Sequence, residues 1–244
     1  YVYWSEFEEG AQYRKHFRRP ATGGDAVLIL DVPTLADGHD YFRLGAFSIS
    51  EDGRYLAYSV DTTGGEYYTA FIKDLQTGEL LKDRIENVNS GLIWAANDTV
   101  LVYGRANENW RVDKVLAHTI GQSADSDVVL FHEETLGFTA SPGMSSNRKW
   151  LVIATGDNET SEGMFTSIDD PTGALTVIRP RKTGVEYSAD FHGETIYILA
   201  NDEHVNFRLA TAPLGKPGEW TTLIAGSDDF YLTDFVLFKD FYVT

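Results

Sequence analysis

The sequence contains no cysteine, and this absence removes several kinds of chemistry at once. Disulfides, thiolate nucleophiles and cysteine-based zinc sites are all excluded. No segment approaches the ~18 apolar residues of a membrane-spanning helix, and the start lacks the charged and apolar regions of a signal peptide. Because the chain opens directly in strand-like residues at Tyr1, we interpret it as a piece of a longer protein. Its compartment stays open, with the cytoplasm favoured over the periplasm.

Basic residues are also scarce, since 20 Lys and Arg stand against 37 Asp and Glu and give a formal net charge of −17. A nucleic acid is therefore excluded as a partner, because proteins that bind it are usually basic. Nor is a membrane expected as a partner. A charge of this sign keeps a protein in solution and attracts cationic ligands.

Aromatic residues and glycine are plentiful, which favours strands and turns over helices. A short apolar segment with an aromatic residue recurs at intervals of about 45 to 50 residues, the length of a four-stranded propeller blade. The copies are Tyr55–Tyr58, Val100–Tyr103, Trp150–Ile153, Thr195–Ile198 and Phe241–Val243. Each is preceded by a strand and a polar turn, as at Glu51–Arg54, and is followed by another polar turn, as at Asp61–Gly65. This alternation predicts an all-β chain built from four-stranded antiparallel blades of a β-propeller.

The ends of the chain predict incomplete blades. Two strands are expected over residues 1–8 and 11–19, and another over 27–32, so the first blade lacks its innermost strand. Two strands over 231–238 and 241–243 begin a sixth blade. We therefore expect one propeller domain over residues 1–244, with about five blades and two further strands. The predicted blade limits are 1–33, 41–86, 91–133, 136–180, 184–226 and, for the start of the next blade, 230–244.

The sequence does not contain a complete hydrolase nucleophile motif. Gly121-Gln122-Ser123 and Gly143-Met144-Ser145 each match the first half of Gly-x-Ser-x-Gly, but neither precedes a segment of helical period. Both serines are therefore expected to be loop residues.

Metal and modification signals are equally weak. The six histidines, His16, His39, His118, His132, His192 and His204, show no tight metal-ligand spacing. The loops Asp157–Glu159 and Asn201–Glu203 contain oxygen ligands suited to calcium, but their equivalent positions in successive blades favour turn chemistry. Asn97 and Asn158 begin glycosylation sequons, which we interpret as chance matches in the absence of an export signal. The sequence thus predicts no catalytic, cofactor-binding or metal-binding residue in this chain, and no cofactor.

One strand of the first hairpin is strongly basic, with Arg14, His16 and Arg18 on one face and with Lys15 and Arg19 between and beyond them. It could pair with acidic residues of a partner domain. A solvated face or a sheet edge is the favoured interpretation, because positive edge residues discourage aggregation between strands.

The segment Gly38–Glu66 resembles the propeller of the oligopeptidase B (protease II) branch of the prolyl oligopeptidase family of serine peptidases. The opening residues Tyr1–Trp4 and Glu9–Tyr13 are similar to the start of the same propeller, and Gly91–Ala95 continues the similarity into the next blade. Beyond about Gly121 the likeness lies in the blade period.

This resemblance implies a seven-bladed propeller that caps an α/β-hydrolase domain and restricts access to short peptides. It also implies cleavage after Lys or Arg by a Ser-Asp-His triad that lies in the hydrolase domain, C-terminal to the propeller. No triad position falls within this sequence, so it is uncertain whether this chain is itself an enzyme, whereas its parent is expected to be a peptidase.

Three hypotheses therefore remain. The favoured one is a non-catalytic, substrate-gating part of an oligopeptidase whose missing hydrolase domain and short cationic peptides are its partners. The second is a stand-alone propeller that binds a ligand in its channel and has no peptidase activity. The third is a complete five-bladed ring, closed by its terminal strands.

Overall fold

The computed structural model describes the backbone of residues 1–244 and the side chains of residues 1–89 and 91–244. Strands dominate, and they are accompanied by one short helix, α1 (Val32–Ala36), and one 3₁₀ turn, η1 (Ala124–Ser126). The predicted all-β propeller class is confirmed. No helix in the described part of the chain is long and apolar enough to cross a membrane.

The first sheet has three antiparallel strands, β1 (Val2–Phe7), β2 (Arg14–Arg19) and β3 (Val27–Asp31), in that order. The second strand begins three residues later than predicted. Gly10 has a φ of 76°, and the amide of Ala11 donates to the carbonyl of Glu8, so the turn continues past Gly10.

The next sheet contains seven strands because one strand serves two blades. Its members, from one edge to the other, are β10 (Val128–His132), β9 (Val112–Thr119), β8 (Val100–Ala106), β7 (Leu80–Ala95), β6 (Tyr68–Asp74), β5 (Tyr55–Asp61) and β4 (Arg43–Ile49). The first half of β7 pairs with β6 and its second half pairs with β8, with Val88 pairing on both sides. The second and third blades are therefore continuous through β7, where the sequence had predicted a break.

Two regular four-stranded sheets follow, each in sequential antiparallel order. The strands of the fourth blade are β11 (Thr139–Met144), β12 (Trp150–Gly156), β13 (Ser161–Ser167) and β14 (Thr176–Arg179). Those of the fifth blade are β15 (Tyr187–His192), β16 (Thr195–Ala200), β17 (Arg208–Pro213) and β18 (Thr221–Ile224).

The chain ends in the short pair β19 (Val236–Leu237) and β20 (Tyr242–Val243). The long strand predicted from residue 231 is wrong, because the preceding segment is held by other bonds. The amide of Leu232 donates to the carbonyl of Asn206, and the Asp234 carboxylate accepts from the amide of Phe235.

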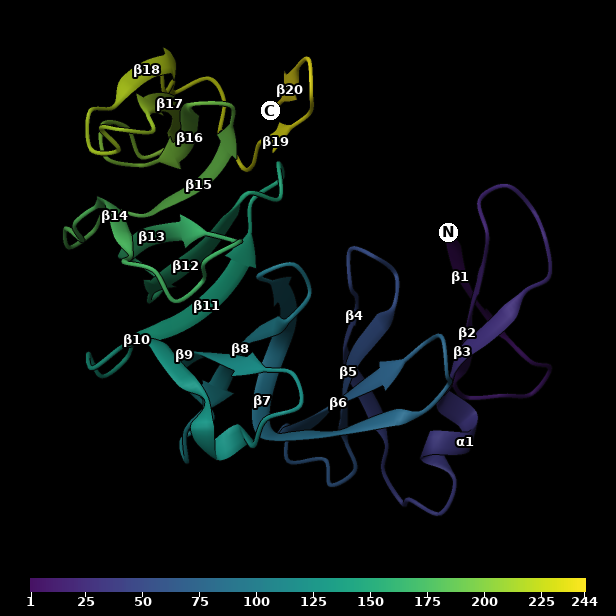
Figure 1. The fold of residues 1–244 in the computed structure, drawn as a ribbon. Helices are drawn as coiled ribbons and strands as arrows, with labels where there is room; N and C mark the ends of the chain where they lie inside the picture. Colours follow the sequence, from purple (N-terminus) through teal and green to yellow (C-terminus); the bar gives the residue numbers. More distant parts are fainter.

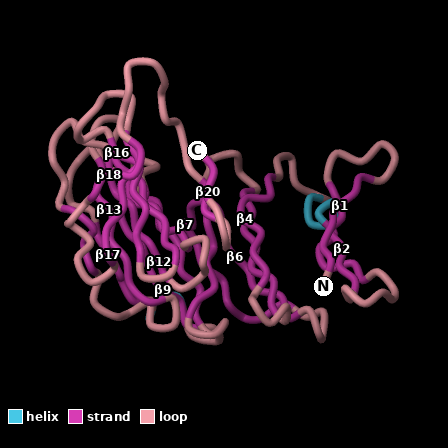
Figure 2. The backbone as a smooth tube through the Cα atoms, turned by 90° about the horizontal axis from the view of Figure 1, so that it is seen from above, coloured by secondary structure: helices cyan, strands magenta, loops and turns pink.

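The sheets stand around an arc, with β4, β7, β11, β15 and β19 toward its inner side (Figure 1). Figure 2 shows the successive sheets side by side, with the helix at the β1–β2 end and loops at both ends of the strands. Within the described backbone, β1 pairs only with β2 and β19 only with β20. The two ends of the arc lie apart in Figure 1, so the five-bladed closure by terminal strands is not formed.

Burial occurs mainly between neighbouring sheets, as expected for blades that cannot cover both faces alone. Leu101, Tyr103 and Ile85 pack between the second and third blades. Phe165, Phe191 and Ile196 do the same between the fourth and fifth. Phe165 and Phe191 have ring centroids 5.0 Å apart, which adds an aromatic contact to the burial.

Candidate functional site

The strand order gathers the turns of the blades at two opposite ends of the strands. We call the first the inner-hairpin end, which carries the turns at residues 50–54, 96–99, 145–149, 193–194 and 238–241. The opposite end carries the turns between the second and third strands of each blade, at residues 62–67, 107–111, 157–160 and 201–207.

A repeated serine turn shapes the inner-hairpin end. Ser145 Oγ donates to Asn147 Oδ1 at 2.8 Å and accepts from the amide of Trp150 at 3.0 Å. In the second blade, Ser50 makes the same two bonds, to Asp52 and from Tyr55. The structure thus places Ser145 in a β-turn, as expected from the incomplete Gly-x-Ser motif.

Neighbouring inner hairpins are bound to one another by carboxylates. Asp98 accepts from the amides of Glu51 and Asp52, both at 3.0 Å, so the third blade holds the turn of the second. In the same way, Asp190 accepts from the amide of Ser146 at 2.8 Å, and the fifth blade holds the turn of the fourth. Charge-assisted bonds of this kind are stronger than neutral ones, and here they fix the relative positions of the turns.

Ser123, the other candidate serine, begins η1, where its hydroxyl accepts from the amide of Asp125. Behind it lies a buried polar array between the second and third blades. The imidazole of His118 is fully buried between Asp127, at 2.7 Å, and Asp83, at 2.9 Å. Burial and donation to Asp127 raise the pKa of Tyr103 in the same array.

The other histidines are dispersed. His16 stacks on Phe47 with ring centroids 4.6 Å apart, and His192 donates from Nε2 to the carbonyl of Lys239 at 2.9 Å. Among the described residues, no three His, Asp or Glu side chains gather into a group that could hold a metal ion.

In each of the two loops considered for calcium, the first carboxylate, Asp157 or Asp202, accepts hydrogen bonds from other groups of the chain. Asp157 accepts from the amides of Glu159 and Thr160 at 2.9 and 2.8 Å. Asp202 accepts from Arg208 Nε at 2.9 Å and from Arg179 Nη1 at 2.8 Å, and these guanidinium bonds lower the pKa of Asp202 against the effect of burial. Both loops therefore have structural roles in the blade edges.

The basic strand β2 differs from its predicted role as a solvated face or sheet edge. It is the central strand of its sheet, and Arg18 is only 5% exposed. Its guanidinium donates to the carbonyls of Gly53 and Leu75, which belong to the second blade. Because these acceptors are distant in sequence, alternation alone could not predict that Arg18 would be buried.

An ion-pair cluster occupies the opposite end between the third and fourth blades. Arg181 donates to Glu133 at 2.7 Å and contacts Glu162 at 2.9 Å. Thr155 donates to the same Glu133 oxygen, Oε2, at 2.6 Å. Despite the opposing effect of burial, these bonds lower the pKa of Glu133 from its usual 4.5 to about 2. The cluster joins two blades through a carboxylate that stays ionised at neutral pH.

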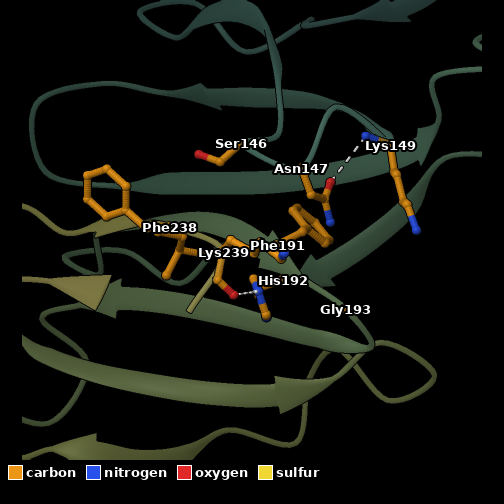
Figure 3. A pocket seen from close by; sticks show the side chains of 9 residues that line it. Ser146, Asn147, Lys149, Phe191, His192, Gly193, Phe238 and Lys239 are labelled. Atoms are coloured by element: carbon orange, nitrogen blue, oxygen red, sulfur yellow. Dashed lines mark hydrogen bonds between the residues drawn. The ribbon is translucent and has the colours of Figure 1, made fainter. Parts of the chain in front are cut away.

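A pocket of about 310 Å³ lies at the inner-hairpin end between the fourth, fifth and sixth blades (Figure 3). Its lining residues are Ser146, Asn147, Lys149, Phe191, His192, Gly193, Leu237, Phe238 and Lys239. Sequence reasoning missed this set, because it combines three turns that are far apart along the chain. The one local signal was the Ser-x-Asn-x-Lys-Trp turn, which repeats the Ser-x-Asp-x-Arg-Tyr turn at Ser50.

In the comparison with known proteins, one family model matches the whole chain. The sequence model of the prolyl oligopeptidase N-terminal β-propeller domain matches residues 1–244. Dipeptidyl aminopeptidase BI of Pseudoxanthomonas mexicana is 34% identical, over 99% of this chain and 36% of that protein. Protease 2 of Moraxella lacunata is 28% identical, over 98% of this chain and 36% of that protein. The chain therefore spans about a third of the length of these relatives.

Solved structures agree with the sequence relatives. Oligopeptidase B from Leishmania major superimposes with a TM-score of 0.89 at 26% identity, over 96% of this chain and 34% of that one. The closed form of oligopeptidase B from Trypanosoma brucei, with covalently bound antipain, also gives a TM-score of 0.89, at 28% identity over 98% of this chain and 35% of that one.

Proposed function

The chain belongs to the prolyl oligopeptidase family as its N-terminal β-propeller domain, and from this membership we propose that it is the substrate-gating part of a serine oligopeptidase. The catalytic residues would lie outside residues 1–244, in an α/β-hydrolase domain of the same parent chain. The observation that carries the proposal is the match over the whole chain combined with coverage of only about a third of each relative.

The arrangement of the blades supports gating. Inner strands from successive blades stand around one arc, and carboxylates hold neighbouring turns together at the inner-hairpin end. A substrate that reaches a catalytic domain past this rigid arc must be narrow, and short peptides satisfy that requirement. No catalytic residue is assigned to this chain, and the absence of one stays a prediction.

The charge distribution supports cleavage of short peptides after Lys or Arg. The turns of the opposite end carry exposed carboxylates at Glu108, Asp157, Glu159 and Glu203. In a chain of net charge −17, these groups raise the local concentration of cationic peptides. We propose that this attraction serves a catalytic domain with a preference for basic residues.

The test compares this chain with the full-length parent on arylamides of Arg and Lys. We expect turnover by the parent and none by this chain. A matched arylamide of Glu serves as the control and is expected to be cleaved at least tenfold more slowly. A parent with an intact triad but no turnover would contradict the proposal, and tight peptide binding without a hydrolase domain in the parent would favour the stand-alone binding module.

A further inference from the structure

The pocket at the inner-hairpin end differs in charge from the rest of this acidic molecule. Among the described side chains that line it, none is acidic and two are lysines, Lys149 and Lys239. Three other surface pockets each include a carboxylate in their lining, for example Asp113, Asp127 or Asp52. The adjoining pocket, which shares His192, Phe238 and Lys239 with this one, contains Asp240. A net charge of −17 makes such an acid-free concavity the favoured place for an anionic group.

Asn147 supplies the pocket with a donor that is already oriented. Its Oδ1 accepts from Ser145 Oγ at 2.8 Å and from the amide of Lys149 at 3.1 Å, so Oδ1 must face the turn. Its Nδ2 is buried and has no hydrogen-bond partner within the described part of the chain. A buried amide donor without a partner is destabilising, and an acceptor from a ligand would relieve that cost. Figure 3 shows the Asn147 amide on the side of the pocket formed by Phe191 and His192.

The remaining walls are apolar. Phe191 is 1% exposed and Leu237 is 8% exposed, whereas Phe238 keeps 47% of its surface exposed. The bond from His192 to the carbonyl of Lys239 connects the fifth and sixth blades beside them. A volume of about 310 Å³ corresponds to roughly ten water molecules of liquid, enough for one apolar side chain and a carboxylate.

We propose that this pocket binds the C-terminal carboxylate and the adjoining apolar side chain of a short peptide. The carboxylate accepts from Asn147 Nδ2 and is attracted by Lys149 and Lys239, while the side chain packs against the exposed ring of Phe238. The choice of a peptide as the ligand rests on the proposed function. The site would bind the carboxyl end of a peptide at the inner-hairpin end, away from the acidic turns of the opposite end that attract basic side chains.

The first experiment titrates this chain with N-acetyl-Phe-Leu, with its C-terminal amide and with sodium acetate. Binding is followed by calorimetry and by the NMR signals of the His192 ring. We expect the free acid to bind at least tenfold more tightly than the amide and than acetate. Equal affinities of acid and amide would overturn the proposal. Equal affinities of acetate and peptide acid would also overturn it, because the site would then bind a free carboxylate.

The second experiment exchanges the amide of Asn147 for a carboxylate. Asn147→Asp retains the turn acceptor, since Asp52 fills the same position in the second blade and accepts from Ser50 and from the amide of Arg54. It removes the donor and adds a negative charge, so affinity for the peptide acid should fall at least tenfold. The matched control, Asp52→Asn, should leave that affinity unchanged.

Lys239→Gln gives an independent variant at an exposed position, where folding is not at risk. It should weaken binding of the acid several-fold and leave binding of the amide unchanged. Wild-type affinity of both Asn147→Asp and Lys239→Gln would overturn the assignment. Binding is measured on this chain and hydrolysis on the full-length parent, so failure of this proposal is distinguishable from failure of the proposed function.

Discussion

Replacing Glu133 by Gln should destabilise the chain by about 3 kcal/mol at neutral pH. The pKa of Glu133 lies at about 2 instead of the usual 4.5, and each pKa unit corresponds to about 1.4 kcal/mol of preference for the ionised form. The side chain is 3% exposed, so solvent screening does little to reduce this figure. In Glu133, Oε1 accepts from the amide of Thr135 and Oε2 accepts from Thr155. The Glu133→Gln variant would keep one of these two acceptors, and it would lose the charge that faces Arg181.

The pH dependence distinguishes charge from packing. Because the pKa of Glu133 is lower in the folded state, its stabilisation is complete above about pH 5 and disappears as the pH falls toward 2. Urea denaturation of wild type and Glu133→Gln at several pH values gives the free energies of unfolding. The difference should shrink from about 3 kcal/mol at pH 7 to near zero at pH 2.

The control is Glu134→Gln, which alters the exposed neighbouring carboxylate and should change stability by less than about 0.5 kcal/mol. A Glu133→Gln effect that stays constant from pH 7 to pH 2 would refute the electrostatic reasoning, as would an equal loss in the control.

Three further substitutions, two at contacts between blades and one at a turn with positive φ, are tested by urea denaturation. Asp98→Ala should cost about 1–2 kcal/mol because it removes the acceptor of two backbone amides in the second blade, and equal stability of Asp98→Ala and wild type would contradict this. Ala96→Gly should stabilise by about 0.5–1 kcal/mol, since Ala96 has a φ of 50°, and a loss would show that the turn is not strained. Arg18→Ala should cost about 2–4 kcal/mol by leaving two buried carbonyls without their donor, whereas exposed Arg19→Ala should cost under about 0.5 kcal/mol.

Much of the fold could be predicted because its signals are local. Alternating apolar residues and polar turns at fixed offsets specify hairpins, and their recurrence specifies blades. The Ser50 and Ser145 turns illustrate this, since each is closed by bonds that span at most five residues.

The remaining features depend on distant partners. Arg18 is buried against two carbonyl acceptors that lie 35 and 57 residues away in the sequence. The pocket depends on the hydrogen bond between His192 and the carbonyl of Lys239, two residues that are 47 positions apart in the sequence. Neither separation leaves a periodic signal in one sequence. The continuity of β7 was also missed. Val88 pairs with strands of two blades, and no local sequence signal distinguishes one long strand from two strands separated by a turn there.

The central claim, that this propeller restricts substrates by size, is tested most directly on the full-length parent. The measurement is kcat/KM for one Arg-containing cleavage site placed in peptides of about 6, 15 and 40 residues, which would span roughly 20, 50 and 130 Å when extended. We predict that kcat/KM falls at least 100-fold between the shortest and the longest peptide. A value that does not change with peptide length would contradict gating by the propeller.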